Sequence, residues 1–348
     1  MPRFYSPRFC SIFLLQTILV RNPCPCYSFL SSTSTHQPSH QRRYFTKSTA
    51  NDVQLLRLRS SKENTNNSEV LHNVGGIMCR EVGIDVKNVG QIKILEATAD
   101  SQDELVEMAC ATEEELSQQS ESEQLIKRGD IYGAVLWPAA SAVSDYLLTT
   151  VVEERPSNSL EGLTILELGT GTGLCALAAA LGGASRVLAT DYEPVPLKLL
   201  EFACGNVNSK ATKTDSEDDV KLKLSRIDTA LFDICGDSPL PPADIVIAAD
   251  IMYEPMTGIA VAVRTVEALK AGSRVIIGCS PGRPGRPHYI SKLKELLPDV
   301  NVEFQEVEGR TCSGPRNDLI CGKGSSSISA EPKALTVALM DLIPEKCL

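Results

Sequence analysis

The sequence predicts an α/β fold in which helices cover both faces of a seven-stranded, mostly parallel sheet. From residue 131 onward, short apolar runs alternate with segments of helical period, which is the pattern of strands joined by crossover helices. A glycine-rich turn follows the first apolar run, in ILELGTGTG at 165–173. The last two runs have no helical segment between them, so we expect an antiparallel pair to close the sheet.

The expected elements follow one another without an internal repeat and form one domain over 131–348. Strands are expected at 163–168, 186–190, 221–228, 243–250, 273–280, 301–308 and 334–343. Helices are expected at 141–152, 174–183, 194–208, 256–269 and 289–297. A polar insertion at 209–220 separates the third helix from the third strand.

The first fifty residues have the composition of an organelle transit peptide. They contain six basic residues and no acidic ones, and they are rich in serine and threonine. The segment RRYFT at 42–46 resembles a mitochondrial processing site, so we expect a mitochondrial location, with the plastid as the alternative. A tail without a targeting role is the remaining interpretation. The apolar stretch 12–20 is shorter than the roughly 20 residues of a bilayer-spanning helix, and no stable membrane insertion is expected.

Two further segments precede the expected domain. Residues 51–76 are polar and predict a disordered linker. Residues 77–130 predict an N-terminal extension, with a short strand or hairpin at 77–98 and an exposed acidic helix and loop at 100–128.

Charge and cysteine spacing exclude some classes of function. The formal net charge is −10, and beyond residue 50 the chain carries 28 basic against 44 acidic side chains. Such an acidic chain will not bind nucleic acid through general phosphate attraction, and it suits a basic, lysine-bearing partner better. The twelve cysteines are scattered and contain no CxxC pair, so we expect structural thiols and no metal site.

The glycine turn is the strongest functional signal. Gly169, Gly171 and Gly173 let the backbone turn tightly and approach a ligand closely. The spacing GxGxG differs from the GxGxxG of NAD-binding turns, and Glu167 precedes it by two residues. A carboxylate there suits a cationic ligand better than a pyrophosphate; it either accepts hydrogen bonds from an ammonium group or organises the turn.

Two acidic positions follow later strands of the expected sheet. Asp191 ends the second strand, where a carboxylate in a nucleotide-binding α/β sheet accepts ribose hydroxyls. Phe232 and Asp233 follow the third strand, where an apolar ring and a carboxylate would suit an adenine ring and its exocyclic amine.

Four segments together resemble a known family. They are GAVLWPAA (133–140), ILELGTGTG (165–173), TDYEP (190–194) and ADIMYEP (249–255). In order and spacing they resemble the seven-β-strand, non-SET protein-lysine methyltransferases, over about 131–307. The resemblance implies a Rossmann-like class I methyltransferase fold with S-adenosyl-L-methionine as the cofactor.

The resemblance also assigns three residues. Trp137 matches the tryptophan that lies against the cofactor, and Asp250 to Tyr253 match the DxxY motif after the fourth strand. It implies that Asp250 orients the acceptor amine and that Tyr253 walls its channel. The segment SRVIIGCSPGRP at 273–284 looks most like the mitochondrial branch that methylates the electron-transfer flavoprotein β-subunit. A second Gly-Arg-Pro at 285–287 and the 209–220 insertion depart from that branch.

The expected function is therefore protein-lysine N-methylation, with a protein that bears an acceptor lysine as the partner. A small-molecule methyltransferase would share every cofactor motif and differ only in the acceptor cleft. A non-catalytic cofactor-binding scaffold would be expected to lose Glu167, Asp191 or Asp250, and all three are present.

Overall fold

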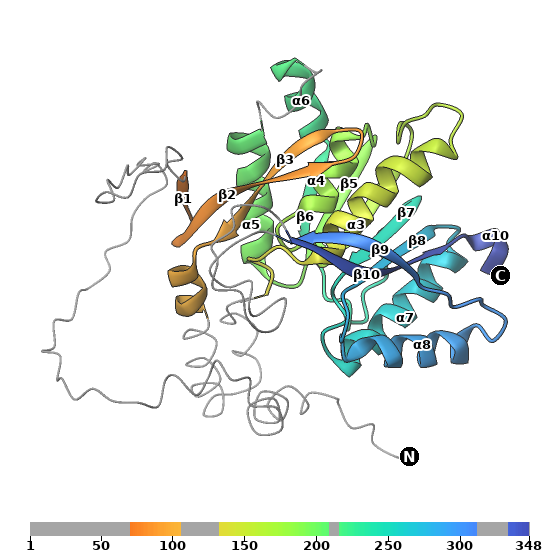
Figure 1. The fold of residues 1–348 in the computed structure, drawn as a ribbon. Coiled ribbons are helices and arrows are strands. Elements are labelled where there is room, and N and C mark those ends of the chain that lie inside the picture. The colour runs from red at the N-terminus through yellow and green to blue at the C-terminus, as the bar shows by residue number, and fades with distance from the viewer. Residues whose placement is uncertain (1–69, 106–131, 209–215, 312–332, 348) are drawn as a thin grey trace, which may run out of the picture.

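The computed structural model describes residues 70–105, 132–208, 216–311 and 333–347, which form two sheets with flanking helices (Figure 1). The expected transit peptide 1–50, the linker up to residue 69 and the acidic segment 106–130 lie outside the described residues. So does the larger part of the 209–220 insertion.

The larger sheet has the seven strands that the sequence predicts. Its order is β6-β5-β4-β7-β8-β10-β9; β6, β5, β4, β7 and β8 are parallel, and β10 pairs antiparallel with β8 and β9. The prediction of a mostly parallel sheet that closes with an antiparallel pair is confirmed. The strands are β4 (Thr164–Leu168), β5 (Arg186–Asp191), β6 (Ile227–Leu231), β7 (Ile245–Ala249), β8 (Arg274–Cys279), β9 (Gln305–Thr311) and β10 (Lys333–Leu342).

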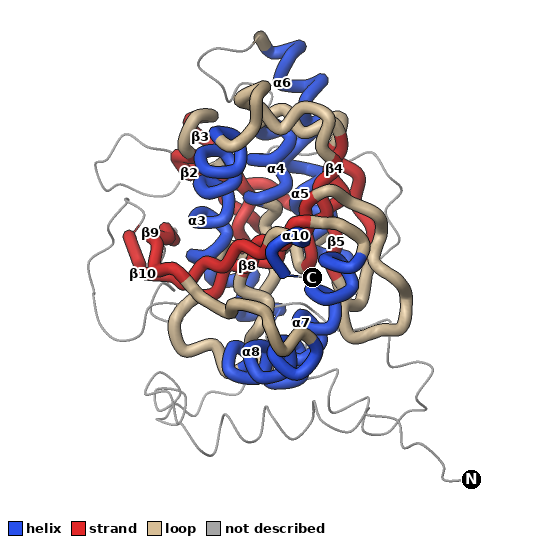
Figure 2. The backbone as a smooth tube through the Cα atoms, turned by 90° about the vertical axis from the view of Figure 1, so that its right-hand side faces the viewer, coloured by secondary structure: helices blue, strands red, loops and turns tan. Residues whose placement is uncertain are grey.

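Helices cover both faces of this sheet, as Figure 2 shows. They are α3 (Pro138–Tyr146) with its π-helical continuation η2 (Leu147–Val151), α4 (Leu174–Leu181), α5 (Pro194–Phe202) with η3 (Ala203–Val207), α6 (Glu217–Leu224), α7 (Pro255–Lys270), α8 (Gly285–Leu296) and α10 (Pro344–Cys347). Within the described ranges, none of the helices has both the length and the apolar character that crossing a bilayer requires.

Each face of the sheet has its own hydrophobic core. Successive strand residues point to opposite faces, so Ile165 joins the cluster beneath α3, α4 and α5, while Leu166 joins the one beneath α7 and α8. This alternation on a central strand explains why the 163–168 run is apolar throughout.

The boundaries of four expected elements differ from the structure by three or more residues, and the first is that of α3, which begins at Pro138 rather than at residue 141. The strand expected at 221–228 is instead helix α6 followed by β6, which begins at Ile227. Helix α8 begins at Gly285, four residues before its expected start, and β9 begins at Gln305 rather than at residue 301.

The second sheet precedes the larger one in the chain. It consists of β1 (Leu71–Val74), β2 (Ile77–Val86) and β3 (Gly90–Ala97), paired antiparallel in that order. The β2–β3 hairpin confirms the expectation for 77–98, and residues 99–105 are helical. Strand β1 corrects the predicted linker, because residues 71–74 pair with β2 through a tight turn at two glycines with positive φ.

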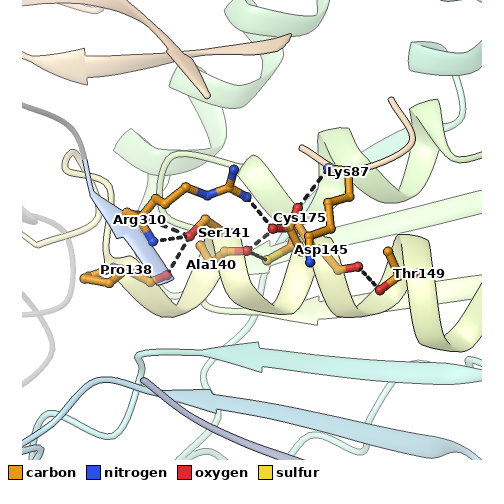
Figure 3. A network of polar contacts seen from close by, with 9 residues as sticks. Lys87, Pro138, Ala140, Ser141, Asp145, Thr149, Cys175 and Arg310 are labelled. Atoms are coloured by element: carbon orange, nitrogen blue, oxygen red, sulfur yellow. Dashed lines mark hydrogen bonds and ion pairs between the residues drawn. The ribbon is translucent and has the colours of Figure 1, made fainter. Parts of the chain in front are cut away.

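Helix α3 ties these parts together (Figure 3). The Ser141 hydroxyl accepts the Arg310 backbone N–H of β9 at 2.6 Å and lies 2.9 Å from the Pro138 carbonyl oxygen. Asp145 forms an ion pair with the Arg310 guanidinium and accepts the Lys87 backbone N–H from the β2–β3 turn at 2.9 Å. One helix therefore fixes the antiparallel edge of the larger sheet and the hairpin of the smaller one.

Candidate functional site

The predicted site residues lie at the carboxyl edge of the parallel strands. The chain runs from β4 outward to β5 and β6, then returns to place β7 on the other side of β4. Ligands of open α/β sheets bind at such a reversal, outside the carboxyl ends of the strands. The turn after β4 and the segment after β7 flank this point.

The glycine turn is closely packed at Gly169 and Gly173 and less crowded at Gly171. Gly169, Gly171 and Gly173 have φ values of 67°, 52° and 82°, in the region that glycine favours. A Cβ on Gly169 would lie 2.5 Å from Cγ2 of Ile251, and one on Gly173 would lie 2.5 Å from Cδ1 of Leu200. A Cβ on Gly171 would come no closer than 3.5 Å to any such neighbour. Gly171 is therefore the least crowded of the three glycines, and a Cβ there would make ordinary contact with the backbone of Gly133.

Glu167 points inward and organises this turn. Its carboxylate accepts the Thr170 hydroxyl at 2.7 Å, and its backbone carbonyl accepts the Thr190 hydroxyl at 2.7 Å. Burial raises the pKa of Glu167 to about 7, with the nearby Asp191 carboxylate as a smaller contribution. Of the two roles that the sequence leaves open, these contacts favour organisation of the turn.

Asp191 fastens the glycine turn to the end of β5. Its carboxylate accepts the Gly171 backbone N–H at 3.1 Å and the Glu193 backbone N–H at 3.2 Å. Its own carbonyl accepts the Phe232 backbone N–H at 2.8 Å, which sets the start of the next loop. The structure therefore brings Asp191, the glycine turn and Phe232 together along the edges of β4, β5 and β6.

Phe232 and Asp233 form the outer part of this edge. Phe232 is half-buried, and the guanidinium of Arg264 lies 5.2 Å from the centre of its ring. Asp233 is exposed and accepts the Cys235 backbone N–H at 2.8 Å. One carboxylate oxygen of Asp233 thus stabilises the turn at 233–235, and the side chain is accessible to solvent.

Asp250 has a left-handed backbone with φ of 61° and a side chain that is 0% exposed. Its carboxylate accepts the Ala139 backbone N–H at 3.0 Å, and both the backbone N–H and the hydroxyl of Ser280 at 2.6 Å. It also accepts Nε of Arg283 at 3.1 Å. One carboxylate thereby joins the ends of β7 and β8 to the first turn of α3.

An aromatic row continues from this network. The Arg283 guanidinium lies 4.1 Å from the centre of the Trp137 ring, within cation–π distance. The indole N–H of Trp137 donates to the Tyr132 carbonyl at 2.9 Å, and the Tyr132 ring stacks on Tyr253 with centroids 5.9 Å apart. Trp137, Asp250 and Tyr253 are therefore linked in space, although 113 residues separate Trp137 from Asp250 in the sequence.

The predicted site residues thus form two groups. Glu167, the glycine turn, Asp191 and Phe232 form one, and Trp137, Asp250 and Tyr253 form the other. They meet where Ile251 packs against Gly169. Ser280, Tyr132 and Arg283 also belong to this site, although none of the expected motifs predicts a role for them. The Pro-Gly-Arg after β8 is the signal for Arg283, because an arginine at an edge rich in buried carboxylates has a partner within reach.

Metal ligands and reactive thiols are not features of the described part of this site. Among the described residues no group of three or more His, Cys, Asp or Glu side chains is placed to hold a metal ion. Cys79, Cys175 and Cys279 are buried, and burial raises the pKa of each thiol, as expected for structural thiols.

Comparison with known proteins points to one family. A sequence model of a family described as lysine methyltransferase matches residues 119–296. The protein N-lysine methyltransferase METTL21A of Danio rerio is 32% identical over 173 residues, which cover 49% of this chain and 71% of that protein. The electron transfer flavoprotein beta subunit lysine methyltransferase of Homo sapiens is 37% identical over 84 residues, which cover 24% of this chain.

The match to the human relative spans 30% of its length, and the matches to its Xenopus laevis and Mus musculus counterparts span 34% and 27% of theirs. Among solved structures, magnesium protoporphyrin IX methyltransferase from Synechocystis with bound SAM aligns with a TM-score of 0.33 and 15% identity. That alignment covers 58% of this chain and 78% of the other.

Proposed function

Since this chain belongs to the lysine methyltransferase family, we propose that it transfers a methyl group from S-adenosyl-L-methionine to the side-chain amine of a lysine in a protein substrate. The observation that carries the proposal is the contact between the two site groups. The glycine turn after β4 and the segment Asp250–Tyr253 after β7 pack together through Gly169 and Ile251. A cofactor in the turn would then lie beside an acceptor held by that segment.

The residues at the edge of β4, β5 and β6 fit the proposed cofactor. The glycine turn 169–173 would receive it, with the Asp191 carboxylate accepting the ribose hydroxyls and Phe232 and Asp233 beside the adenine. Trp137 would lie against the cofactor. When bound, the cofactor supplies a methyl group activated by a sulfonium.

The acceptor side has to position and desolvate a lysine. The amine has a pKa near 10.4 in water and must lose its proton before it attacks, which partial burial beside a cation favours. We assign Tyr253 to the wall of the lysine channel. The sequence alone favours direct contact between Asp250 and the amine, but its four donors favour a positioning role, in which it holds Ser280 and the start of α3.

The compartment is proposed from residues 1–50, which are basic, serine-rich and free of acid. A mitochondrial address agrees with the Pro-Gly-Arg at 281–283, which resembles the branch that methylates the electron-transfer flavoprotein β-subunit. A fusion of residues 1–50 to a fluorescent protein should enter mitochondria. Cytosolic fluorescence would refute the address, and import into plastids would change the compartment.

The activity is tested by incubating the purified chain with methyl-labelled S-adenosylmethionine and an organelle extract. We expect a labelled protein whose label maps to lysine by mass spectrometry, and no label with Asp191→Ala at low cofactor concentration. Label in small molecules alone would make the chain a small-molecule methyltransferase. Cofactor binding without any label would make it a scaffold.

A further inference from the structure

A cavity beside the acceptor side of the site contains two arginines. It has a volume of about 490 Å³ and is lined by Gly282, Arg283, Arg286, Pro287 and Ile290, at the start of α8. Among the described residues, none that lines it is acidic. The chain as a whole carries a net charge of −10, so a positively charged cavity at this place stands against the general field of the protein.

Arg283 is held rigidly but is not fully satisfied. Its Nε donates to Asp250, its guanidinium lies on the Trp137 ring, and its side chain is 14% exposed. Its Nη2 is buried and has no hydrogen-bond partner among the described residues. A buried donor on a cation is costly to leave unpaired, so this atom marks a place for an acceptor.

Arg286 lies in the first turn of α8, three residues after Arg283, and shares the cavity. Its guanidinium lies 4.5 Å from the centre of the Phe304 ring, and within the described part of the chain it has no ion pair. Helix α8 starts at Gly285 without a side-chain cap and without an acidic residue in its first turn. The N–H groups of Gly285 and Arg286 already donate to the Met252 and Arg283 carbonyls, so the positive charge of the cavity comes from the two guanidinium groups.

We infer that this cavity, lined by Arg283 and Arg286, is a carboxylate-binding subsite next to the methyl-transfer site. Planar guanidinium groups that are already oriented by stacking suit a carboxylate, which they bind through paired hydrogen bonds. The inference rests on the proposed function, which supplies two carboxylates. One is that of the cofactor's amino-acid end, and the other is an acidic side chain near the acceptor lysine of the substrate.

Calorimetry on the full chain tests whether the cavity binds the carboxylate of the cofactor. S-adenosylhomocysteine is compared with its decarboxylated analogue, in wild type and in Arg283→Gln and Arg286→Gln. If the cavity takes the cofactor's carboxylate, the wild type prefers S-adenosylhomocysteine by about tenfold to a hundredfold, the scale of a hydrogen bond to a charged group. In the variants this preference falls toward one.

Peptide binding tests whether the cavity binds an acidic side chain of the substrate. Fluorescence anisotropy compares two lysine peptides that differ only in glutamate or glutamine beside the lysine, with S-adenosylhomocysteine present. If the cavity takes a substrate carboxylate, the wild type prefers the glutamate peptide about tenfold or more, and the variants lose that preference. Arg286→Gln leaves Asp250 untouched, so it remains informative if Arg283→Gln unfolds.

Arg186→Gln is the matched control, since that arginine is 61% exposed and pairs with Asp228 outside the cavity. It should keep every preference of the wild type. The inference is overturned if the wild type binds both members of each ligand pair equally well. It is also overturned if Arg283→Gln and Arg286→Gln both keep the preferences of the wild type. In either case a wild type that still methylates protein lysine would leave the proposed function standing.

Discussion

Asp250 combines an unusual backbone with a complete set of donors. Its φ of 61° is one that asparagine and aspartate adopt more readily than other residues with a side chain. Each carboxylate oxygen accepts two hydrogen bonds, and one of the four donors is the Arg283 guanidinium. Asparagine fits the backbone but has an NH₂ in place of one oxygen, so Asp250→Asn separates the two properties.

We expect Asp250→Asn to lower the free energy of unfolding by about 3–5 kcal/mol, because it leaves a buried cation without its partner and turns an NH₂ toward other donors. Turnover should fall by about a hundredfold, since the segment that we propose to bind the acceptor lysine is no longer held in place. Urea denaturation and single-turnover assays measure the two effects. Asp228→Asn, whose side chain is 56% exposed, is the control and should change stability by less than about 0.5 kcal/mol. Wild-type stability in Asp250→Asn would contradict the network.

Glu167 makes a prediction about pH. Its pKa is raised from 4.5 to about 7, so between these values the folded protein binds a proton that the unfolded chain releases. The stabilisation is present in full below pH 4.5 and is lost as the pH rises through 7, by up to about 3 kcal/mol. The free energy of unfolding of the wild type should therefore fall relative to that of Glu167→Gln as the pH rises from 5 to 8. A difference that is independent of pH would show that Glu167 is not protonated on folding.

The acidic residues of the site could be located from the sequence, but their contacts could not. Asp191 and Asp250 each follow an apolar run, and the carboxyl ends of parallel strands share one edge. The donors to Asp250 come from 111 residues before it and from 30 to 33 residues after it. No local pattern encodes such pairs. The sequence thus predicts which residues lie together at this edge. It does not predict that donors from the same chain fill the hydrogen-bonding capacity of the Asp250 carboxylate.

Elements were predictable where periodicity and caps agreed. The segment 221–228 alternates apolar and polar residues and favours a strand. In the structure Ser216 accepts the Asp219 backbone N–H at 3.2 Å as a helix cap, and three acidic residues occupy the first turn of α6. Val220 and Leu224, four residues apart, are the buried pair. The cap lies inside the polar insertion 209–220, whose composition predicts no helix or strand.

The glycine of the second Gly-Arg-Pro, Gly285, is required by the close contact between α7 and α8. A Cβ on Gly285 would lie 2.3 Å from the Glu254 carbonyl oxygen, and one on Gly258 would lie 2.1 Å from the Gly285 carbonyl oxygen. The Gly285 N–H also donates to the Met252 carbonyl at 3.1 Å. The backbones of two helix starts are therefore in direct contact, beside the segment 250–253.

Gly285→Ala should push these helix starts apart and destabilise the protein by about 1–3 kcal/mol, the usual cost of overpacking. Urea denaturation measures the change. Gly205→Ala is the matched control, because no atom lies within 4 Å of a Cβ there and its φ is not positive. Equal stability of the two variants would mean that α8 adjusts without cost.

At the scale of the whole molecule, the N-terminal sheet and the larger domain share one core. Ile84, Ile92 and Ile94 of the hairpin are fully buried in the same cluster as Leu199 and Leu200 of α5. The expected division at residue 131 therefore falls between parts that pack together. Periodicity could not reveal this, because it shows that a strand has a buried face but not what covers it.

Polar contacts join the two parts at defined points. The Asn208 side chain accepts the Lys93 backbone N–H at 2.9 Å and donates to the Lys93 carbonyl at 2.7 Å, so it continues the pairing of β3 at the end of η3. Glu96 accepts the Leu136 backbone N–H at 3.1 Å and pairs with Arg80 at 2.7 Å. The residue that precedes Trp137 is thus held by the N-terminal sheet, which connects this sheet to the site.

We therefore expect a chain of residues 131–348 to be aggregated or unfolded, whereas a chain of residues 70–348 unfolds cooperatively. Without the hairpin, the α5 and η3 face would expose its apolar side chains, and Asn208 would lose both backbone partners. Circular dichroism melts of the two chains test this. In the full chain, Asn208→Ala should cost about 1–3 kcal/mol, because it leaves the Lys93 N–H and C=O unpaired. If residues 131–348 melt as cooperatively and at the same temperature as residues 70–348, the two parts fold independently, and the hairpin is an accessory to the domain rather than a wall of its core.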